Sequence, residues 1–140
     1  MGMIHTELKL INVMDENYAQ GGYIRTSDIR SETVTATVDT GSMYVVITEE
    51  LYKKLGLSPM DKRIAKCANG QRVSCILTSP VHIKWKERAV ILQTLVVPGA
   101  EKVLFGALAL EGMDLMVNPV AQELVGVHGD KEEIYALKAS

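Results

Sequence analysis

Hydrophobic residues alternate with polar ones in several short runs of this chain, which is the spacing of half-buried β-strands. Residues 34–38 and 81–85 alternate most regularly, and residues 7–13 are predicted as a first strand. Residues 89–97 are more continuously apolar, which favours a central strand. The other segments predicted to be extended are 23–25, 43–47, 63–67, 71–77, 115–117, 123–125 and 133–138.

Helix signals are confined to two short segments. Thr48 precedes Glu49 and Glu50, so its hydroxyl is placed to cap a helix whose first turn favours negative charge, and Gly56 is placed to end it. We expect helices only over residues 49–55 and about 107–112, and a loop where Asp, Asn and Gly gather at 15–22. The predicted fold class is all-β with one or two short helices.

The length and composition of the chain indicate how large its core is and which residue types fill it. The chain has 140 residues, enough for one core, and shows no low-complexity linker or repeat, so we expect a single domain over residues 1–140. It is 47% hydrophobic but only 5% aromatic, so Val, Ile, Leu and Met must fill the interior. This composition fits strands packed in a small barrel or sandwich.

Charge and hydropathy exclude several classes of function. A formal net charge of −2 gives no electrostatic footprint for nucleic acid. No run reaches the roughly 18 apolar residues that a membrane helix needs. The first residues lack the basic and apolar regions of a signal peptide. We therefore expect a cytoplasmic protein that binds neither nucleic acid nor membranes.

The two cysteines do not predict a disulfide or a metal site. If Asn69-Gly70 is a two-residue hairpin turn, Cys67 opposes Arg72 and Cys75 opposes Ile64. The sulfurs would then lie three positions out of register on opposite faces, which favours free thiols. The three histidines show no ligand spacing around the cysteines, so no metal is expected.

The chemistry of the chain is concentrated where the strand 34–38 runs into Asp39-Thr40-Gly41-Ser42. The carboxylate is an acid–base group, and Gly41 lets a substrate backbone approach closely. The hydroxyls of Thr40 and Ser42 could donate hydrogen bonds that bias the protonation of carboxylates. Asp-Thr-Gly also occurs as an ordinary turn at the end of a strand.

This stretch resembles the signature of the aspartic proteases, and a second match lies downstream. Residues 103–110 (VLFGALAL) resemble the two-apolar-then-glycine element that the family places beside its catalytic turn. Together with residues 111–119, they are similar to small bacterial and archaeal proteases of the retroviral, or retropepsin-like, type, over roughly residues 6–126. The chain departs from the retroviral pattern at Ala107 and Leu108, where those enzymes usually carry Arg and then Asp or Asn.

The resemblance implies a small closed barrel that is active as a homodimer. Two carboxyls that share one proton activate water in this chemistry, whereas the chain has a single Asp-Thr-Gly, at Asp39. A two-fold axis would bring Asp39 beside its symmetry mate, and no cofactor is needed. The interface is expected to recruit the terminal strands around residues 8–10 and 134–137.

By its order in the chain, the hairpin at Ala68, Asn69, Gly70 and Gln71 corresponds to the flap that closes over substrate in the family. Its alternative is an ordinary surface hairpin. Met43, Tyr44 and Leu104 fall where the family lines its substrate cleft, although plain core packing explains each of them equally well.

Three hypotheses remain open at this stage. The first is a homodimeric aspartic endopeptidase that cleaves peptides or proteins. The second is a homodimeric module that binds peptides on the same fold without cutting them, since fold does not imply function. The third is a structural β-domain with a fortuitous motif, which requires both matches to be accidental. The intact Asp39, Thr40 and Gly41 favour the first hypothesis.

Overall fold

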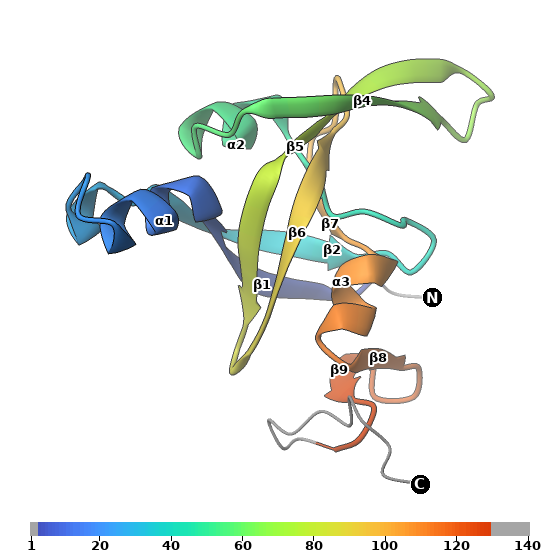
Figure 1. Cartoon of the computed structure of the whole chain (residues 1–140). Coiled ribbons are helices and arrows are strands. Elements are labelled where there is room, and N and C mark those ends of the chain that lie inside the picture. Colours follow the sequence, from blue (N-terminus) through green and yellow to red (C-terminus); the bar gives the residue numbers. More distant parts are fainter. Residues whose placement is uncertain (1–2, 130–140) are drawn as a thin grey trace, which may run out of the picture.

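The computed structural model describes residues 3–129 and is built on a closed six-stranded barrel (Figure 1). The strands follow one another around the barrel in the order β1-β2-β7-β3-β6-β5, and β5 closes it by pairing with β1. An additional strand, β4, lies outside β5, and β8 and β9 form a separate two-stranded sheet. The predicted all-β, barrel-like fold class is therefore confirmed.

The elements have the following bounds, in chain order. They are β1 (His5–Asn12), α1 (Val13–Gln20), the 3-10 helix η1 (Thr26–Asp28), β2 (Ser31–Val38), β3 (Val46–Ile47), α2 (Glu49–Lys54), β4 (Pro59–Lys66), β5 (Arg72–Trp85), β6 (Arg88–Val96), β7 (Val103–Phe105), α3 (Ala107–Gly112), β8 (Leu115–Asn118) and β9 (Glu123–Gly126). The predicted strand at 133–138 lies outside the described residues.

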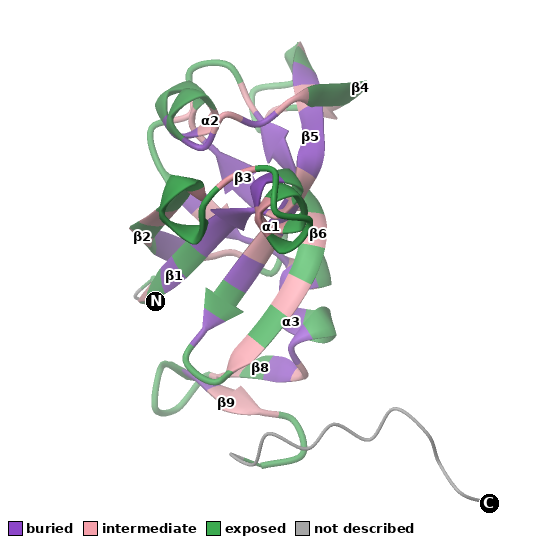
Figure 2. Cartoon of the chain, turned by 60° about the vertical axis from the view of Figure 1, so that its left-hand side comes forward, coloured by how far each residue is buried: buried purple, intermediate pink, exposed green. Residues whose placement is uncertain are grey.

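The barrel interior is filled almost entirely by aliphatic side chains, as the composition predicted. Alternation along β1 buries Leu8 and Leu10 while Glu7 and Lys9 face solvent, and Phe105 is fully buried on β7. Figure 2 shows the buried residues concentrated on the barrel strands, whereas β4 is almost wholly exposed. The main cluster also contains Ala36, Val45, Ile47, Leu51, Leu55, Val81, Ile83, Trp85, Val96 and Val103.

The predictions for the two short helices are confirmed. Thr48 Oγ1 accepts a hydrogen bond from the amide of Leu51 at 3.1 Å and so caps α2. Gly56, at φ +62°, ends that helix in a Schellman motif, because its amide bonds to Lys53 O and the next amide bonds to Tyr52 O. Helix α3 has the predicted bounds.

The prediction of a loop at residues 15–22 is wrong, because α1 occupies most of it. Asn12 Oδ1 accepts the amide of Asp15 at 3.1 Å as an N-cap, and acidic residues follow in the first turn. Asp15 and Asn17, which suggested a loop, thus lie within the helix, and Asn12, predicted as part of the first strand, is its cap. The predicted extended piece at 23–25 is also not a strand, and η1 follows it.

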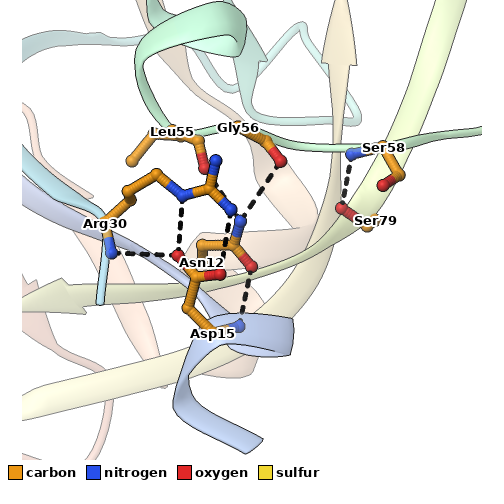
Figure 3. Close-up of polar contacts among 7 residues, drawn as sticks. All are labelled: Asn12, Asp15, Arg30, Leu55, Gly56, Ser58 and Ser79. Atoms are coloured by element: carbon orange, nitrogen blue, oxygen red, sulfur yellow. Dashed lines mark hydrogen bonds and ion pairs between the residues drawn. The ribbon is translucent and has the colours of Figure 1, made fainter. Parts of the chain in front are cut away.

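A buried polar cluster holds α1 and the end of α2 to the barrel (Figure 3). Asp15 accepts three hydrogen bonds from Arg30, from the amide at 3.0 Å and from Nε and Nη2 at 2.9 and 3.0 Å. Asn12 Nδ2 donates to the carbonyl of Leu55 at 2.8 Å. The Arg30 guanidinium, which is bound to Asp15, also fills the space beside Gly56 at the end of α2.

The remaining differences concern strand bounds. Of the predicted strand 43–47 only Val46–Ile47 is regular, since the preceding residues bend around the end of β7. Strand β5 joins the two predicted strands 71–77 and 81–85 into one, with an irregularity in its pairing between Leu77 and Pro80 that accommodates the proline.

Among the described residues, no helix has the length and apolarity that a membrane crossing requires.

Candidate active site

Asp39 stands at the point where β2 leaves the barrel. Strand β2 runs parallel to β7, with Val38 opposite Phe105, and the Asp39 amide donates to Phe105 O at 3.0 Å. The residue is half-buried, while Thr40 and Gly41 after it are exposed. The end of a barrel strand therefore presents the carboxylate at the protein surface.

A tight turn holds the carboxylate in place. The Asp39 carbonyl accepts the amide of Ser42 at 3.1 Å, and Asp39 Oδ1 accepts the amide of Gly41 at 2.9 Å. Within residues 3–129, no hydrogen bond or ion pair engages Oδ2. One carboxylate oxygen is thus fixed by the backbone. A Cβ on Gly41 would lie 3.2 Å from Oδ1, so glycine also gives this oxygen room.

The second sequence match lies directly beside this turn, as expected. At the start of α3, the amides of Ala107 and Leu108 donate to the carbonyls of Ser42 and Met43, at 2.7 and 3.0 Å. Gly106 makes the contact possible, because a Cβ there would overlap Tyr44 O. Three backbone hydrogen bonds, one to Phe105 of β7 and two from the start of α3, therefore determine where the Asp39 turn sits.

Within one chain, the Ser42 hydroxyl has a different partner from the predicted one. Ser42 Oγ donates its single hydrogen to Tyr44 O at 2.8 Å. A hydroxyl has only one hydrogen, so it cannot also donate to the Asp39 carboxylate. Ser42 stabilises the loop that follows Asp39. The Thr40 side chain is exposed and has no hydrogen-bond partner among the described residues.

The three predicted cleft residues differ in their surroundings. Met43 is 61% exposed and follows the Asp39 turn at the surface. Tyr44 is half-buried and packs against Cys75, Leu77 and Leu95 below the β4–β5 hairpin. Leu104 is half-buried in the middle of β7, between its partners on β2 and β3. Tyr44 is thus the one of the three that links the Asp39 loop to the hairpin.

The β4–β5 hairpin projects from the barrel on the same side as the loop after β2 (Figure 1). Its tip is not the two-residue turn that Asn69-Gly70 suggested. Cys67 pairs with Gln71, the Gly70 amide donates to Cys67 O at 2.9 Å, and Gly70 has φ +85°. This is a three-residue loop with a left-handed glycine, and residues 68–71 are all exposed.

This change of one position in register reverses the faces of β4. Arg63 lies opposite Cys75, and Ala65 lies opposite Val73, so both share the face that packs on Tyr44. The predicted register placed Lys62 and Ile64 on that face instead. Both cysteines are free, but they lie on the same face, not on opposite faces as predicted.

Arg63 was not among the predicted site residues, because the predicted register placed its side chain on the opposite face of β4. Its Nη1 donates to Asp61 Oδ2 at 2.7 Å. The Asp61 carboxylate and then the Tyr44 hydroxyl raise the pKa of Arg63 above its ordinary value, and Arg63 in turn lowers the pKa of Asp61. Arg63 therefore lies close to Tyr44, on the side of the hairpin that faces the Asp39 loop.

Strand β1, which was expected to contribute to a dimer interface, pairs with a neighbouring strand on each side in a single chain. Leu8 and Leu10 are 1% and 0% exposed within one chain, and β1 is hydrogen-bonded to both β2 and β5. Residues 134–137 lie outside the described part of the chain.

Within the described residues 3–129, no group of three or more His, Cys, Asp or Glu side chains is placed to hold a metal ion.

Several solved structures are similar to this chain. No curated protein matches the chain. The retroviral protease-like domain of Ddi1 from Leishmania major has a similar fold, with a TM-score of 0.55 at 11% identity, over 89% of this chain and 88% of that one. The protease of EIAV, solved with the inhibitor HBY-793, matches with a TM-score of 0.44 at 26% identity, over 53% of this chain and 70% of that one.

A retropepsin-like aspartic protease from Rickettsia conorii also matches, with a TM-score of 0.45 at 16% identity, over 84% of this chain and 89% of that one. The sequence model of the family described as aspartyl protease matches residues 26–127, which span β2 and the Asp39 turn through to β9. This match covers well over half of the chain and includes both motifs that meet at Asp39. The chain belongs to the aspartyl protease family and has the retropepsin-like fold.

Proposed function

We propose that the protein is an aspartic endopeptidase whose active site forms from two copies of Asp39 in a homodimer. The main support for this proposal is the position of the Asp39 carboxylate. It is held at the open end of a barrel strand, with Oδ1 fixed by Gly41 and Oδ2 free of partners among the described residues. A chain of this family with one Asp-Thr-Gly needs a second carboxylate, and a symmetric partner supplies it.

The chemistry follows from two carboxyls that share one proton. The ionised carboxylate takes a proton from a water molecule as the water attacks the peptide carbonyl. The protonated carboxyl donates its proton to the carbonyl oxygen, and a carboxyl then protonates the leaving amine when the C–N bond breaks. Thr40 and Gly41 are exposed next to Asp39, so this turn is available for contact with a partner chain.

The β4–β5 hairpin is proposed as the flap over the bound peptide. Its tip residues Ala68, Asn69, Gly70 and Gln71 are exposed, and Tyr44 packs against its inner face next to the Asp39 loop. Closure of such a hairpin excludes water and holds the peptide backbone. Met43 and Leu104 are proposed to contribute apolar surface to the same cleft.

The substitution Asp39→Asn tests the catalytic assignment. Asn has nearly the same shape but cannot exchange protons, so the variant should stay folded and lose at least about a thousandfold in kcat/KM. Cleavage of an unfolded protein and of peptide mixtures, followed by mass spectrometry, measures the loss. Asp28→Asn, an exposed aspartate in η1, is the matched control and should retain full activity.

The outcomes separate the hypotheses. Undiminished cleavage by Asp39→Asn would show that Asp39 is not catalytic. A wild-type protein that is dimeric and retains peptides but never cleaves them would instead support the peptide-binding module. A protein that neither binds nor cleaves peptides would point to a purely structural domain.

A further inference from the structure

The β4–β5 hairpin has two chemically different faces. Alternation and register place Ala65, Val73, Cys75 and Leu77 on the inner face, where they pack with Tyr44. Lys62, Lys66 and Arg72 belong to the opposite, outer face. The inner face is therefore apolar except where Asp61 and Arg63 complete it at the base of the hairpin.

The guanidinium of Arg63 is oriented on this inner face. Nη1 donates both to Asp61 Oδ2 at 2.7 Å and to the Lys62 carbonyl at 2.9 Å, and within residues 3–129 no carboxylate or carbonyl accepts from Nε or Nη2. The side chain is 44% exposed, so a ligand can reach it. Tyr44, whose hydroxyl contributes to the raised pKa of Arg63, follows Asp39 by five positions in the same loop.

The hairpin as a whole carries a net positive charge. Residues 59–76 carry four cationic side chains and a single carboxylate, that of Asp61. The ion pair with Asp61 therefore orients Arg63 without cancelling the positive charge of the hairpin. Arginine binds carboxylates through two parallel N–H donors, which makes it selective for acidic side chains.

We propose that Arg63 is a specificity-determining residue that selects an acidic side chain in the substrate, in a subsite bounded by Tyr44 and the inner face of the hairpin. The inference rests on the proposed protease function. An extended peptide between the hairpin and the Asp39 loop directs alternate side chains toward the hairpin. One of these side chains would meet Arg63, at a fixed distance in sequence from the cut bond.

The test uses peptide mixtures in which one position at a time is fixed as Asp, Glu, Gln or Lys. The wild-type protein should cleave peptides with Asp or Glu at one position about fivefold faster, in kcat/KM, than the Gln equivalents, since a partly exposed ion pair has this order of strength. Arg63→Gln should abolish the preference, and Arg63→Glu should shift it toward Lys.

Lys62→Gln is the matched control, because it removes the same charge one residue away on the outer face. It should leave the acidic preference intact. An equal fall in kcat/KM for all peptides in Arg63→Gln would show that Arg63 only positions Tyr44, and this result would overturn the inference. Loss of the preference in Lys62→Gln as well would mean that the hairpin acts by overall charge, which would also overturn it.

Failure of the proposed function gives a different result. If the wild-type protein cleaves none of the mixtures, retention of the same peptides on immobilised Asp39→Asn protein measures the subsite without catalysis. Preferential retention of acidic peptides that disappears in the Asp39→Asn, Arg63→Gln double variant supports the inference. Equal retention of acidic and neutral peptides overturns it.

Discussion

The amide of Asp39 donates to the carbonyl oxygen of Phe105 over 3.0 Å, and this bond ties together two motifs that are far apart in the sequence. The carboxylate is placed by the segment that passes beside it as much as by its own turn. Gly106 follows Phe105 and lies against the loop after Asp39, so the geometry of the site depends on a glycine that carries no chemistry.

Gly106→Ala should therefore destabilise the protein severely. Its φ of −91° suits any residue, so the effect is purely steric: the added Cβ would overlap Tyr44 O and lie 2.6 Å from Ser42 O. We expect a loss of about 3 kcal/mol or more in the free energy of unfolding, measured by urea denaturation. Gly41→Ala is the comparison, since its nearest contact is 3.2 Å and it should cost less than about 1 kcal/mol. Equal stability of Gly106→Ala and wild type would show that the close approach of Gly106 to the loop is incorrect.

Ser42→Ala should lower the stability of the fold without changing the pH dependence of kcat/KM. Loss of the 2.8 Å bond to Tyr44 O is expected to lower the free energy of unfolding by about 1 kcal/mol. A carboxyl pair that shares one proton gives a bell-shaped dependence of kcat/KM on pH, and both limbs should keep their positions in this variant. The measurement is kcat/KM on one peptide from acid to mildly alkaline pH. A displaced alkaline limb would mean that the hydroxyl turns toward Asp39 in the active dimer.

Asp15→Asn should make the stability less dependent on pH. The hydrogen bonds and charge of Arg30 lower the pKa of Asp15 below its ordinary 3.8, so the folded state binds this proton less readily than the unfolded state. The ion pair thus stabilises the protein fully above pH 3.8, and the stabilisation is lost as the pH falls through the lower folded pKa.

At neutral pH, Asp15→Asn should reduce the free energy of unfolding by about 2 kcal/mol, because a charge-assisted bond to a buried carboxylate is lost. The difference from wild type should shrink as the pH falls below about 4. Glu50→Gln breaks an exposed pair with Lys54 and should cost less than about 0.5 kcal/mol. Denaturant titrations at several pH values test this, and a constant difference across the acid range would contradict the assignment.

Activity should belong to the dimer alone. Light scattering should show a homodimer, and specific activity should fall on dilution as the dimer dissociates. Addition of an equal amount of Asp39→Asn protein should reduce the activity of wild-type protein by about half after subunit exchange, because mixed dimers lack one of the two carboxylates. Activity that is unchanged by the variant and linear in protein concentration would show that a single chain suffices.

Local sequence signals determined much of this molecule. Alternation identified β1, β2 and β5, because one face of each strand is buried and the other is solvated. The cap at Thr48 and the glycine at 56 defined α2, since both act within one helical turn. The Asp-Thr-Gly-Ser stretch marked the candidate site in the same way, through residues that are neighbours in the chain.

The tertiary structure decided what depends on distant partners. Residues 15–20 form part of a helix capped by Asn12 instead of a loop, and the bond of Asp15 to Arg30, which is distant along the chain, holds that helix in place. The Ser42 hydroxyl donates to Tyr44 O in a loop that the first amides of α3 hold through Ser42 O and Met43 O. Local propensity alone predicts neither outcome, because distant segments hold both α1 and the loop after Asp39 in place.

The number of residues in the hairpin tip, two or three, determines which face of the hairpin carries the Arg63 side chain. Asn69-Gly70 is compatible with loops of two or three residues, and each sends the side chains of β4 to opposite faces. The sequence determined that a basic hairpin follows the Asp39 loop; only the packing of Ala65, Val73 and Cys75 on Tyr44 decided which of its charges points inward. A strand has a period of two, so one position of register reverses every side chain, and long-range burial selects between the two arrangements.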